Sequence, residues 1–293
     1  MQSEHHLDHR SLTAEYIKSA IDKSESDELT CLVPGDDERA GALLREGGFR
    51  YVGKRLVEGK VMTVFKWFRG LAKHEDMASF FDRRVADYDL HMSDGNDSYE
   101  STFISLFEDV PKTAGRVDVL DLGCGTGAEL KYLFQKAPNA RVVGMDVSEG
   151  MLWRLRETYR DRAGNIDTIR ASYVGTDLGE GRYDCVVACS TLHHLLAEDK
   201  SSLYVTIKKA LREAGYLLIS DFVAETVEDE QARRKGYLEL VEKGAINRSG
   251  IYHIDLNLTL DHEVDLLKDA GLAVTRMKRL SFNQVIIAAR SQH

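Results

Sequence analysis

Several features that would place this chain in other classes are missing. No apolar run approaches the roughly 18 residues that a membrane-spanning helix needs, so we expect no membrane partner. The stretch from Met1 to Arg10 is polar and rich in histidine, unlike the basic and then apolar start of a secretory signal. The sequence therefore predicts a cytoplasmic protein.

Cysteine is also scarce. The chain has four cysteines, and no two of them form a C-x-x-C pair. All of them lie in or beside stretches that we expect to be buried strands, where a small thiol packs as a core residue. We therefore expect buried thiols and no metal site at Cys31, Cys124, Cys185 and Cys189.

An excess of basic charge is missing as well. The chain has 39 Lys and Arg against 48 Asp and Glu, which gives a net charge of −9. Binding to nucleic acid relies on basic side chains that neutralise phosphates, so we expect no nucleic-acid partner and a small-molecule substrate. A length of 293 residues exceeds one average domain, which favours one large α/β domain plus a small one.

The large domain is organised around a strand, a glycine turn and a second strand. The apolar run over residues 117–122 predicts a strand buried on both faces of a parallel sheet, and it breaks into the turn 123–127. Apolar residues at helical spacing follow, with Thr126 and Glu129 as a predicted capping box. The next strand ends at Asp146, about twenty residues past the last glycine, where a ribose diol would be held.

The glycine spacing indicates a ligand class. Gly123, Gly125 and Gly127 carry no Cβ, so the backbone can turn tightly and a ligand can approach it closely. A dinucleotide fingerprint would be G-x-G-x-x-G, whereas this turn is G-x-G-x-G and follows Asp121, an acid that would repel a pyrophosphate. The spacing therefore argues against NAD.

The run VLDLGCGTG, with the acid at Asp146, resembles motif I and its successor in the class I S-adenosylmethionine (SAM) dependent methyltransferases. The resemblance implies an α/β fold with a doubly wound, Rossmann-like sheet of seven strands, SAM as cofactor and S-adenosylhomocysteine (SAH) as product. It implies that Asp121 faces the cationic methionyl end and that Asp146 takes both ribose hydroxyls. The full implied set of cofactor-binding residues is Tyr88, Asp121, Gly123, Cys124, Gly125, Gly127, Asp146, Val147, Met151, Ser172, Tyr173 and Ser190.

Two later segments refine this resemblance. The third strand, expected over 166–172, ends in Ser172 where the family usually has an acid for the adenine amino group, and a neutral acceptor is weaker. After the fourth strand, the segment 190–195, S-T-L-H-H-L, closely resembles the family's S-x-x-L-H-H-L but has one residue fewer between the serine and the first leucine. Nucleic-acid aminomethylases carry an N/D-P-P-Y/F motif there, so its absence argues against base methylation.

Two segments are expected to cover the substrate. Residues 77–110 predict two helices and resemble the lid of the ubiquinone and menaquinone methyltransferases, with Tyr88 as the lid residue unless it only packs the helix. An insert over 222–258 is expected to cap the substrate pocket. The candidate catalytic residues are His194, His253 and Tyr252, which we expect to meet Tyr88 above the methyl group. A base would help if the acceptor carries a proton, and a structural role is the alternative for each histidine.

Residues 1–70 predict a separate small α+β domain with the order β-α-β-α-β-β, joined by a linker over 71–76 to the methyltransferase domain over 77–293. Its LDHRSL start resembles the sulfur carriers typified by SirA and TusA. Those carriers have a Cys-Pro pair where this chain has Thr13-Ala14-Glu15, so no persulfide can form. Docking or homodimer formation is the role that we expect.

The sequence thus predicts SAM-dependent methyl transfer to a small-molecule acceptor. Two alternatives stay open. The chain could bind SAM without catalysis as an interaction protein, or it could carry out another SAM chemistry on the same scaffold.

Overall fold

The computed structural model describes residues 5–7, 9–24, 28–34, 37–46, 49–57, 60–68, 75–85, 97–281 and 283–291. The chain divides into two units, the first formed by Met1–Lys73 and Arg84–Asn96 and the second by His74–Arg83 and Asp97–His293. No helix within the described ranges is both long enough and apolar enough to cross a membrane.

The first unit contains a four-stranded sheet and two helices. Its sheet order is β1-β2-β4-β3, with β1 parallel to β2 and the other pairs antiparallel. Thr13 begins the first helix, because its hydroxyl accepts from Tyr16 N at 3.1 Å. The elements follow the order expected from the sequence: β1 (His5–Leu7), α1 (Ala14–Lys23), β2 (Glu28–Pro34), α2 (Glu38–Glu46), β3 (Arg50–Val57) and β4 (Lys60–Phe68).

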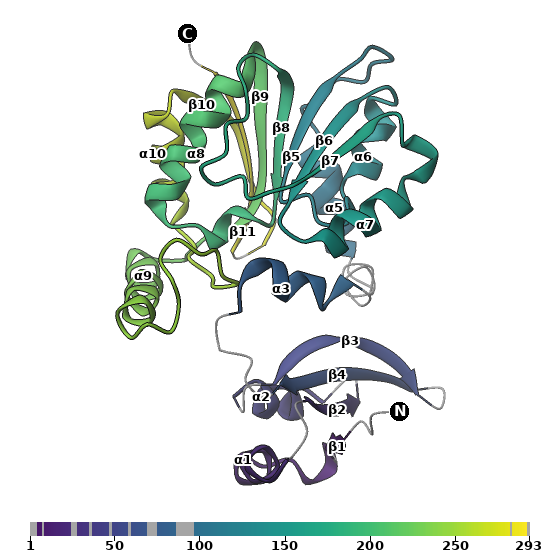
Figure 1. The fold of residues 1–293 in the computed structure, drawn as a ribbon, viewed down its shortest axis with the longest axis vertical. Helices are drawn as coiled ribbons and strands as arrows, with labels where there is room; N and C mark the ends of the chain where they lie inside the picture. Colours follow the sequence, from purple (N-terminus) through teal and green to yellow (C-terminus); the bar gives the residue numbers. More distant parts are fainter. Residues whose placement is uncertain are drawn as a thin grey trace. The chain divides into compact units, whose positions relative to one another are not determined.

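The second unit is built on a seven-stranded sheet in the order β10-β11-β9-β8-β5-β6-β7, which Figure 1 shows. The pairs from β9 through β7 are parallel, and β11 runs antiparallel to both β9 and β10. This confirms the doubly wound sheet expected from the sequence. The strands are β5 (Asp118–Leu122), β6 (Arg141–Asp146), β7 (Ile166–Arg170), β8 (Tyr183–Cys189), β9 (Leu211–Phe222), β10 (Leu272–Arg279) and β11 (Gln284–Ser291).

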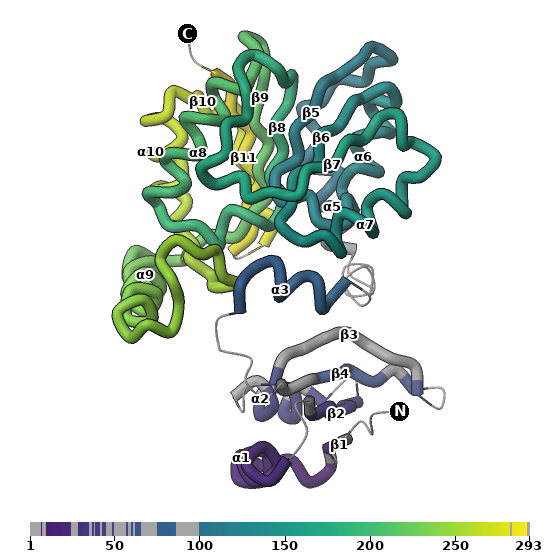
Figure 2. Tube along the Cα trace, viewed as in Figure 1, coloured from purple at the N-terminus to yellow at the C-terminus, as the bar shows by residue number. Residues whose placement is uncertain are grey.

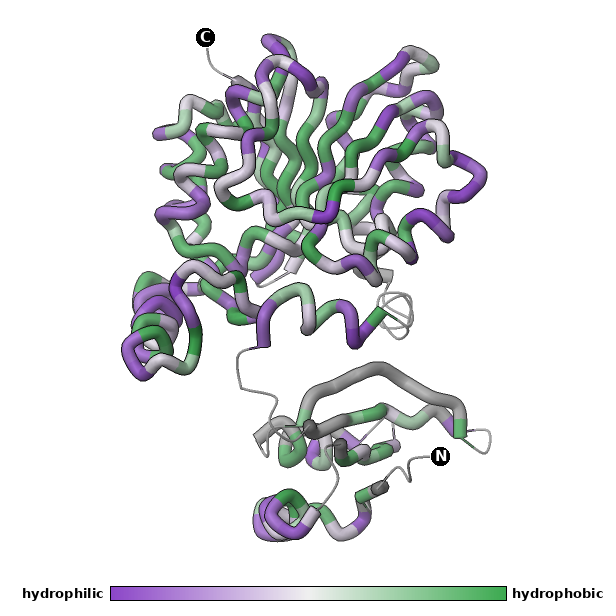
Figure 3. The backbone as a smooth tube through the Cα atoms, viewed as in Figure 1, coloured by the Kyte–Doolittle hydropathy of each residue, from purple (hydrophilic) through white to green (hydrophobic). Residues whose placement is uncertain are grey.

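Burial explains why the central strands read as apolar runs. Val119, Leu120 and Leu122 of β5 are each at most 1% exposed, because helices cover both faces of the sheet. Figure 3 colours these central strands mainly as hydrophobic. The helices are α3 (Met77–Asp82), α5 (Asp97–Leu106), α6 (Leu130–Lys136), α7 (Glu149–Thr158), α8 (Ala197–Ala210), α9 (Val227–Glu242) and α10 (Leu260–Asp269).

Two local expectations are wrong. The capping box fails because α6 begins only at Leu130, without a side-chain cap, and Thr126 Oγ1 has no hydrogen-bond partner. The helical spacing of Leu203, Ile207 and Leu211 predicts a helix over 199–214, but α8 ends at Ala210. Leu211 is already extended there and pairs with Tyr183 at the start of β9. The absence of the capping box matters for the site, because Glu129 does not cap α6 and is buried beside the glycine turn.

Candidate active site

The glycine turn lies between β5 and α6 and is fixed to β6. The backbone N–H groups of Gly123 and Cys124 donate to Met145 O at 2.8 and 3.2 Å. Gly123, Gly125 and Gly127 have φ values of +65°, +49° and +71°, a region that other residues rarely adopt.

The three glycines serve different purposes. A Cβ on Gly123 would come within 2.7 Å of Thr191 Cβ, and one on Gly127 would lie 3.0 Å from Leu130 and 3.1 Å from Leu155. Packing therefore excludes a side chain at Gly123, and at Gly127 the tight contacts add to the constraint of the positive φ. A Cβ on Gly125 would meet nothing within 4 Å, so this glycine faces open space where a ligand can approach the backbone.

Asp146 stands beside this open position. Its Oδ2 accepts from Gly125 N at 2.9 Å and its Oδ1 accepts from Ser148 N at 2.8 Å. Burial raises the pKa of this carboxyl, and the two N–H bonds oppose the rise. Each carboxylate oxygen keeps a second lone pair, so the fixed group can still accept from two hydroxyls.

Asp121 and Glu129 form an acidic patch under the turn. Asp121 is fully buried beside the side chain of Glu129, and no donor from another described residue reaches the oxygens of Asp121 or Oε1 of Glu129. Burial and the neighbouring Glu129 raise the pKa of Asp121 well above its usual value, and burial raises the pKa of Glu129. A buried acid without a partner is costly, and a cationic ligand would remove that cost. These acids therefore fit the positively charged methionyl end of SAM.

The other predicted cofactor residues differ in burial and in backbone conformation. Ser148 caps α7 by accepting from Met151 N at 3.1 Å, while the Met151 side chain itself is buried. Ser190 has a φ of +52°, unusual for a residue other than glycine, and its N–H donates to Ser220 O at 2.7 Å. Val147 is partly exposed beside Asp146. Tyr88 lies outside the described residues.

Tyr173 does not point into an open site. Its side chain is buried, and its hydroxyl lies 2.7 Å from Thr191 Oγ1 and donates to Thr191 O at 3.1 Å. The preceding Ser172 uses its hydroxyl to accept from Val174 N at 3.1 Å. Cys124 is also buried, and burial raises the pKa of its thiol, so it remains protonated.

Helix α3 links the two sides of the site. At its start Met77 N donates to Ile251 O at 2.9 Å, and at its end Asp82 accepts from Ser148 Oγ at 2.5 Å and from Gly150 N at 3.0 Å. The helix therefore runs from the insert to the first turn of α7, next to Asp146 (Figure 2). The sequence predicts a helix here, whereas its lid role stays a prediction and the contacts of Asp82 with α7 were not foreseen.

The histidine segment follows β8 as a short 3-10 helix, η3 (Leu192–His194). His193 Nδ1 lies 2.5 Å from Asp221 Oδ1, and Asp221 Oδ2 accepts from the N–H groups of Leu192 and His193 at 2.8 and 3.0 Å. Burial alone would raise the pKa of Asp221, but His193 lowers it, so this carboxyl is ionised. Sequence reasoning missed this pair, because nothing in the sequence connects residues 193 and 221.

Three predicted catalytic residues lie near η3. The rings of His194 and His253 are 4.8 Å apart, and His253 stacks on Phe80 of α3 at 3.6 Å. His194 and Tyr252 line one cavity of about 170 Å³, and the hydroxyl of Tyr252 accepts from Asn247 N. Their catalytic roles stay a prediction.

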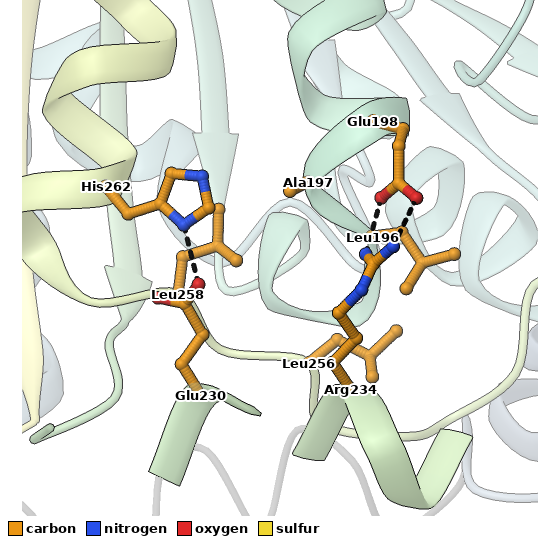
Figure 4. A pocket seen from close by; sticks show the side chains of 8 residues that line it. All are labelled: Leu196, Ala197, Glu198, Glu230, Arg234, Leu256, Leu258 and His262. Carbon is orange, nitrogen blue, oxygen red and sulfur yellow. Dashed lines mark hydrogen bonds and ion pairs between the residues drawn. The ribbon is translucent and has the colours of Figure 1, made fainter. Parts of the chain in front are cut away.

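A larger cavity of about 320 Å³ lies between α8, α9 and α10 (Figure 4). An Arg234–Glu198 pair at 2.7 and 2.8 Å and a His262–Glu230 pair at 2.6 Å line it, above an apolar floor. No residue of the glycine turn lines this cavity, so its size does not make it the cofactor site.

Comparisons with known proteins agree with this geometry. Residues 119–215 match the family model of a methyltransferase domain. The malonyl-[acyl-carrier protein] O-methyltransferase of Acetivibrio thermocellus is 26% identical over 160 residues, which are 53% of this chain and 54% of that protein, so the chain spans about half of this relative. The carboxy-S-adenosyl-L-methionine synthase of Wolinella succinogenes is 27% identical over 66% of this chain and 85% of its own.

Solved structures share the fold. The N-methyltransferase NodS from Bradyrhizobium japonicum, in complex with SAH, matches with a TM-score of 0.54 and 16% identity over 75% of this chain and 100% of that one. A chain of the Haloferax volcanii complex between the Trm112 methyltransferase activator and a methyltransferase matches with a TM-score of 0.56 and 16% identity, over 75% of this chain and 99% of its own.

The seven-stranded sheet and the acid-flanked glycine turn define a class I Rossmann-like methyltransferase fold. Residues 119–215, which include the glycine turn and strands β6 to β8, are similar to the methyltransferase-domain family. The fold and this similarity agree with a SAM-dependent methyltransferase domain, whose cofactor would be S-adenosylmethionine.

Proposed function

We propose that this chain transfers the methyl group of SAM to a small-molecule acceptor and releases SAH. One observation carries the proposal: the buried acid pair Asp121 and Glu129 lies under a turn whose Gly125 faces open space. Bound SAM supplies the methyl group and the leaving group, while the protein supplies alignment and exclusion of water.

The residues around η3 and the insert are where we propose that the methyl acceptor binds. His194 and Tyr252 line the smaller cavity, and the ring of His253, which stacks on Phe80 of α3, lies 4.8 Å from the ring of His194. We propose that the insert and α3 together hold the acceptor and exclude water from it. This arrangement favours a small molecule over a polymer, because the cavity is only about 170 Å³.

The first unit and the assembly belong to this proposal as well. We propose the domain limits 1–70 and 77–293, a SirA-like or TusA-like first domain that serves docking or homodimer formation, and a cytoplasmic location. The lid sequence supports a likeness to the ubiquinone and menaquinone methyltransferases. Formation of SAH from SAM with a small-molecule extract separates catalysis from mere SAM binding, and mass analysis of the nucleoside product detects any other SAM chemistry.

Replacing Asp146 by alanine should weaken SAM and SAH binding by about 1–3 kcal/mol, the usual cost of leaving hydrogen-bonding groups without a partner. Isothermal titration calorimetry measures the change. Asp265→Ala is the matched control, because Asp265 is exposed on α10 and forms a surface ion pair with Lys268, away from the glycine turn. Equal affinity of Asp146→Ala and wild type would show that the ribose is held elsewhere.

SAM affinity should rise with pH, because burial and Glu129 raise the pKa of Asp121 and a cation favours its ionised form. At a pH below the raised pKa of Asp121, SAM binding must release the proton of this carboxyl group. At a pH above it, the group is already ionised and no proton is released. Calorimetry in buffers of different ionisation enthalpy should therefore report net proton release for wild type. Asp121→Asn should bind more weakly and release fewer protons, whereas proton uptake by wild type would contradict the assignment.

A further inference from the structure

We propose that His193, oriented by Asp221, accepts the proton of the acceptor, and that the acceptor atom is therefore an oxygen or nitrogen that carries a proton at neutral pH. This inference rests on the proposed methyl transfer. It replaces His194 and His253 as candidate bases and selects hydroxyls and amines over carboxylates, thiolates and carbon acceptors.

The first step is the fixed position of Asp221. This residue lies near the carboxyl end of β9 and is buried, and its two oxygens accept from three backbone N–H groups, those of Leu192, His193 and Phe222. Such a carboxylate cannot rotate away from the histidine ring. Asp221 is thus a positioning residue, 28 positions along the chain from its partner.

The second step is the tautomer of His193. An ionised carboxylate only accepts hydrogen bonds, so Nδ1 of His193, at 2.5 Å, must be the donor. A neutral ring then carries its lone pair on Nε2, where it can accept a proton, and Asp221 stabilises the imidazolium that forms. Sequence reasoning could not assign this tautomer, because it depends on the pairing with β9.

The third step is the direction in which Nε2 faces. Asp255 Oδ1 lies 3.9 Å from Nε2, beyond hydrogen-bond distance, and the Asp255 side chain is 54% exposed. Two residues before the histidine, Thr191 lies against Gly123 of the cofactor turn. His193 therefore stands between the cofactor turn and a partly open position, at the carboxyl end of the sheet where such folds bind ligands.

The neighbouring histidines are less suited to this role. His194 Nδ1 lies 3.1 Å from Ile254 O, and burial together with the charges of His193 and His253 lowers the pKa of His194 well below its usual value. His253 stacks on Phe80. Among the described residues, the other charged groups near η3 are Asp255 from the insert, 3.9 Å from His193 Nε2 and 3.7 Å from His194 Nδ1, and Lys200 from α8. Of the two carboxylates, only Asp221 lies within hydrogen-bond distance of the His193 ring.

The step balances without a further reactant. The acceptor oxygen or nitrogen forms a bond to the methyl carbon, and the carbon–sulfur bond breaks with its electron pair left on sulfur. The acceptor proton passes to Nε2 of His193 and from there to water as the product leaves.

The test compares His193→Gln and Asp221→Asn with the control His262→Gln. The control removes a similar histidine–carboxylate pair, His262 with Glu230, from the larger cavity between α8, α9 and α10 (Figure 4). Transfer of labelled methyl from SAM is measured with a protein-free bacterial small-molecule extract and with phenol and alkylamine probes. His193→Gln should lower the rate about 10²–10⁴-fold, with SAM affinity by calorimetry within a few-fold of wild type. His262→Gln should keep the wild-type rate.

Two readouts distinguish a base from a structural residue. The loss in His193→Gln should shrink as pH approaches the ionisation of the phenol probe, since an ionised acceptor needs no base. Nitrogen NMR of the wild-type protein without substrate should show His193 protonated at Nδ1 and unprotonated at Nε2, and Asp221→Asn should change that tautomer. The NMR result stands even if a variant fails to fold.

Several results would overturn the inference. An Nε2-protonated His193, an unchanged rate in His193→Gln, or label found only on thiols or carboxylates would each do so. Possible ligand atoms of His193, His194 and Asp255 lie within 4.8 Å of one another, so stoichiometric Zn²⁺ or Mn²⁺ that is lost in Asp255→Asn would assign a metal site instead. A wild-type protein that binds no SAM would instead refute the proposed function.

Discussion

Replacing Lys200 by methionine is expected to lower the free energy of unfolding by about 3–5 kcal/mol, the effect of removing one partner of a buried ion pair. Lys200 on α8 is 1% exposed, and its Nζ lies 2.5 Å from Glu263 Oε2 on α10. The hydroxyl of Tyr204 donates to the other oxygen of Glu263. Without the ammonium group, Glu263 would keep a buried charge with only one polar partner.

Denaturant unfolding of three variants separates the buried charge from lost packing. Lys268→Met removes an exposed lysine of the same helix pair and should cost little, because surface ion pairs contribute about 0–1 kcal/mol. The double variant Lys200→Met/Glu263→Leu removes both charges and should recover most of the loss. A double variant less stable than Lys200→Met would show that packing and not charge dominates.

The central strands and the turn could be predicted because their signals are local. A strand buried on both faces is an apolar run, so β5 could be predicted from the sequence. A turn with a left-handed backbone favours glycine, so the turn at Gly123 and Gly125 could be predicted as well. The acid at the end of β6 follows from the regular length of one strand–helix–strand unit. Asp146 could therefore be placed without a structure.

The acceptor side could not be predicted in the same way. The pairing of His193 with Asp221 depends on the order β9-β8 in the sheet, and the stack of Phe80 on His253 depends on where α3 meets the insert. Neither depends on spacing along the chain. The burial of Lys200 and Glu263 could not be predicted either, because it depends on the packing of α8 against α10.

Two alanine substitutions in the glycine turn should separate folding from cofactor binding. Gly123→Ala is expected to lower the free energy of unfolding by about 2–5 kcal/mol. Alanine is strained at a φ of +65°, and its Cβ would come within 2.7 Å of Thr191 Cβ. Thr191 also bonds Tyr173, so it cannot move aside without breaking a buried hydrogen bond. Thermal and denaturant unfolding measure this loss.

Gly125→Ala should have the opposite balance. Its Cβ meets nothing within 4 Å, so the variant bears only the strain of a positive φ, about 1–3 kcal/mol, and should remain folded. The added methyl group fills the space through which a ligand approaches the turn, so SAM affinity should fall about tenfold or more. Calorimetry on the folded variant decides the matter: wild-type affinity in Gly125→Ala would mean that SAM does not lie over this glycine, whatever the stability of Gly123→Ala.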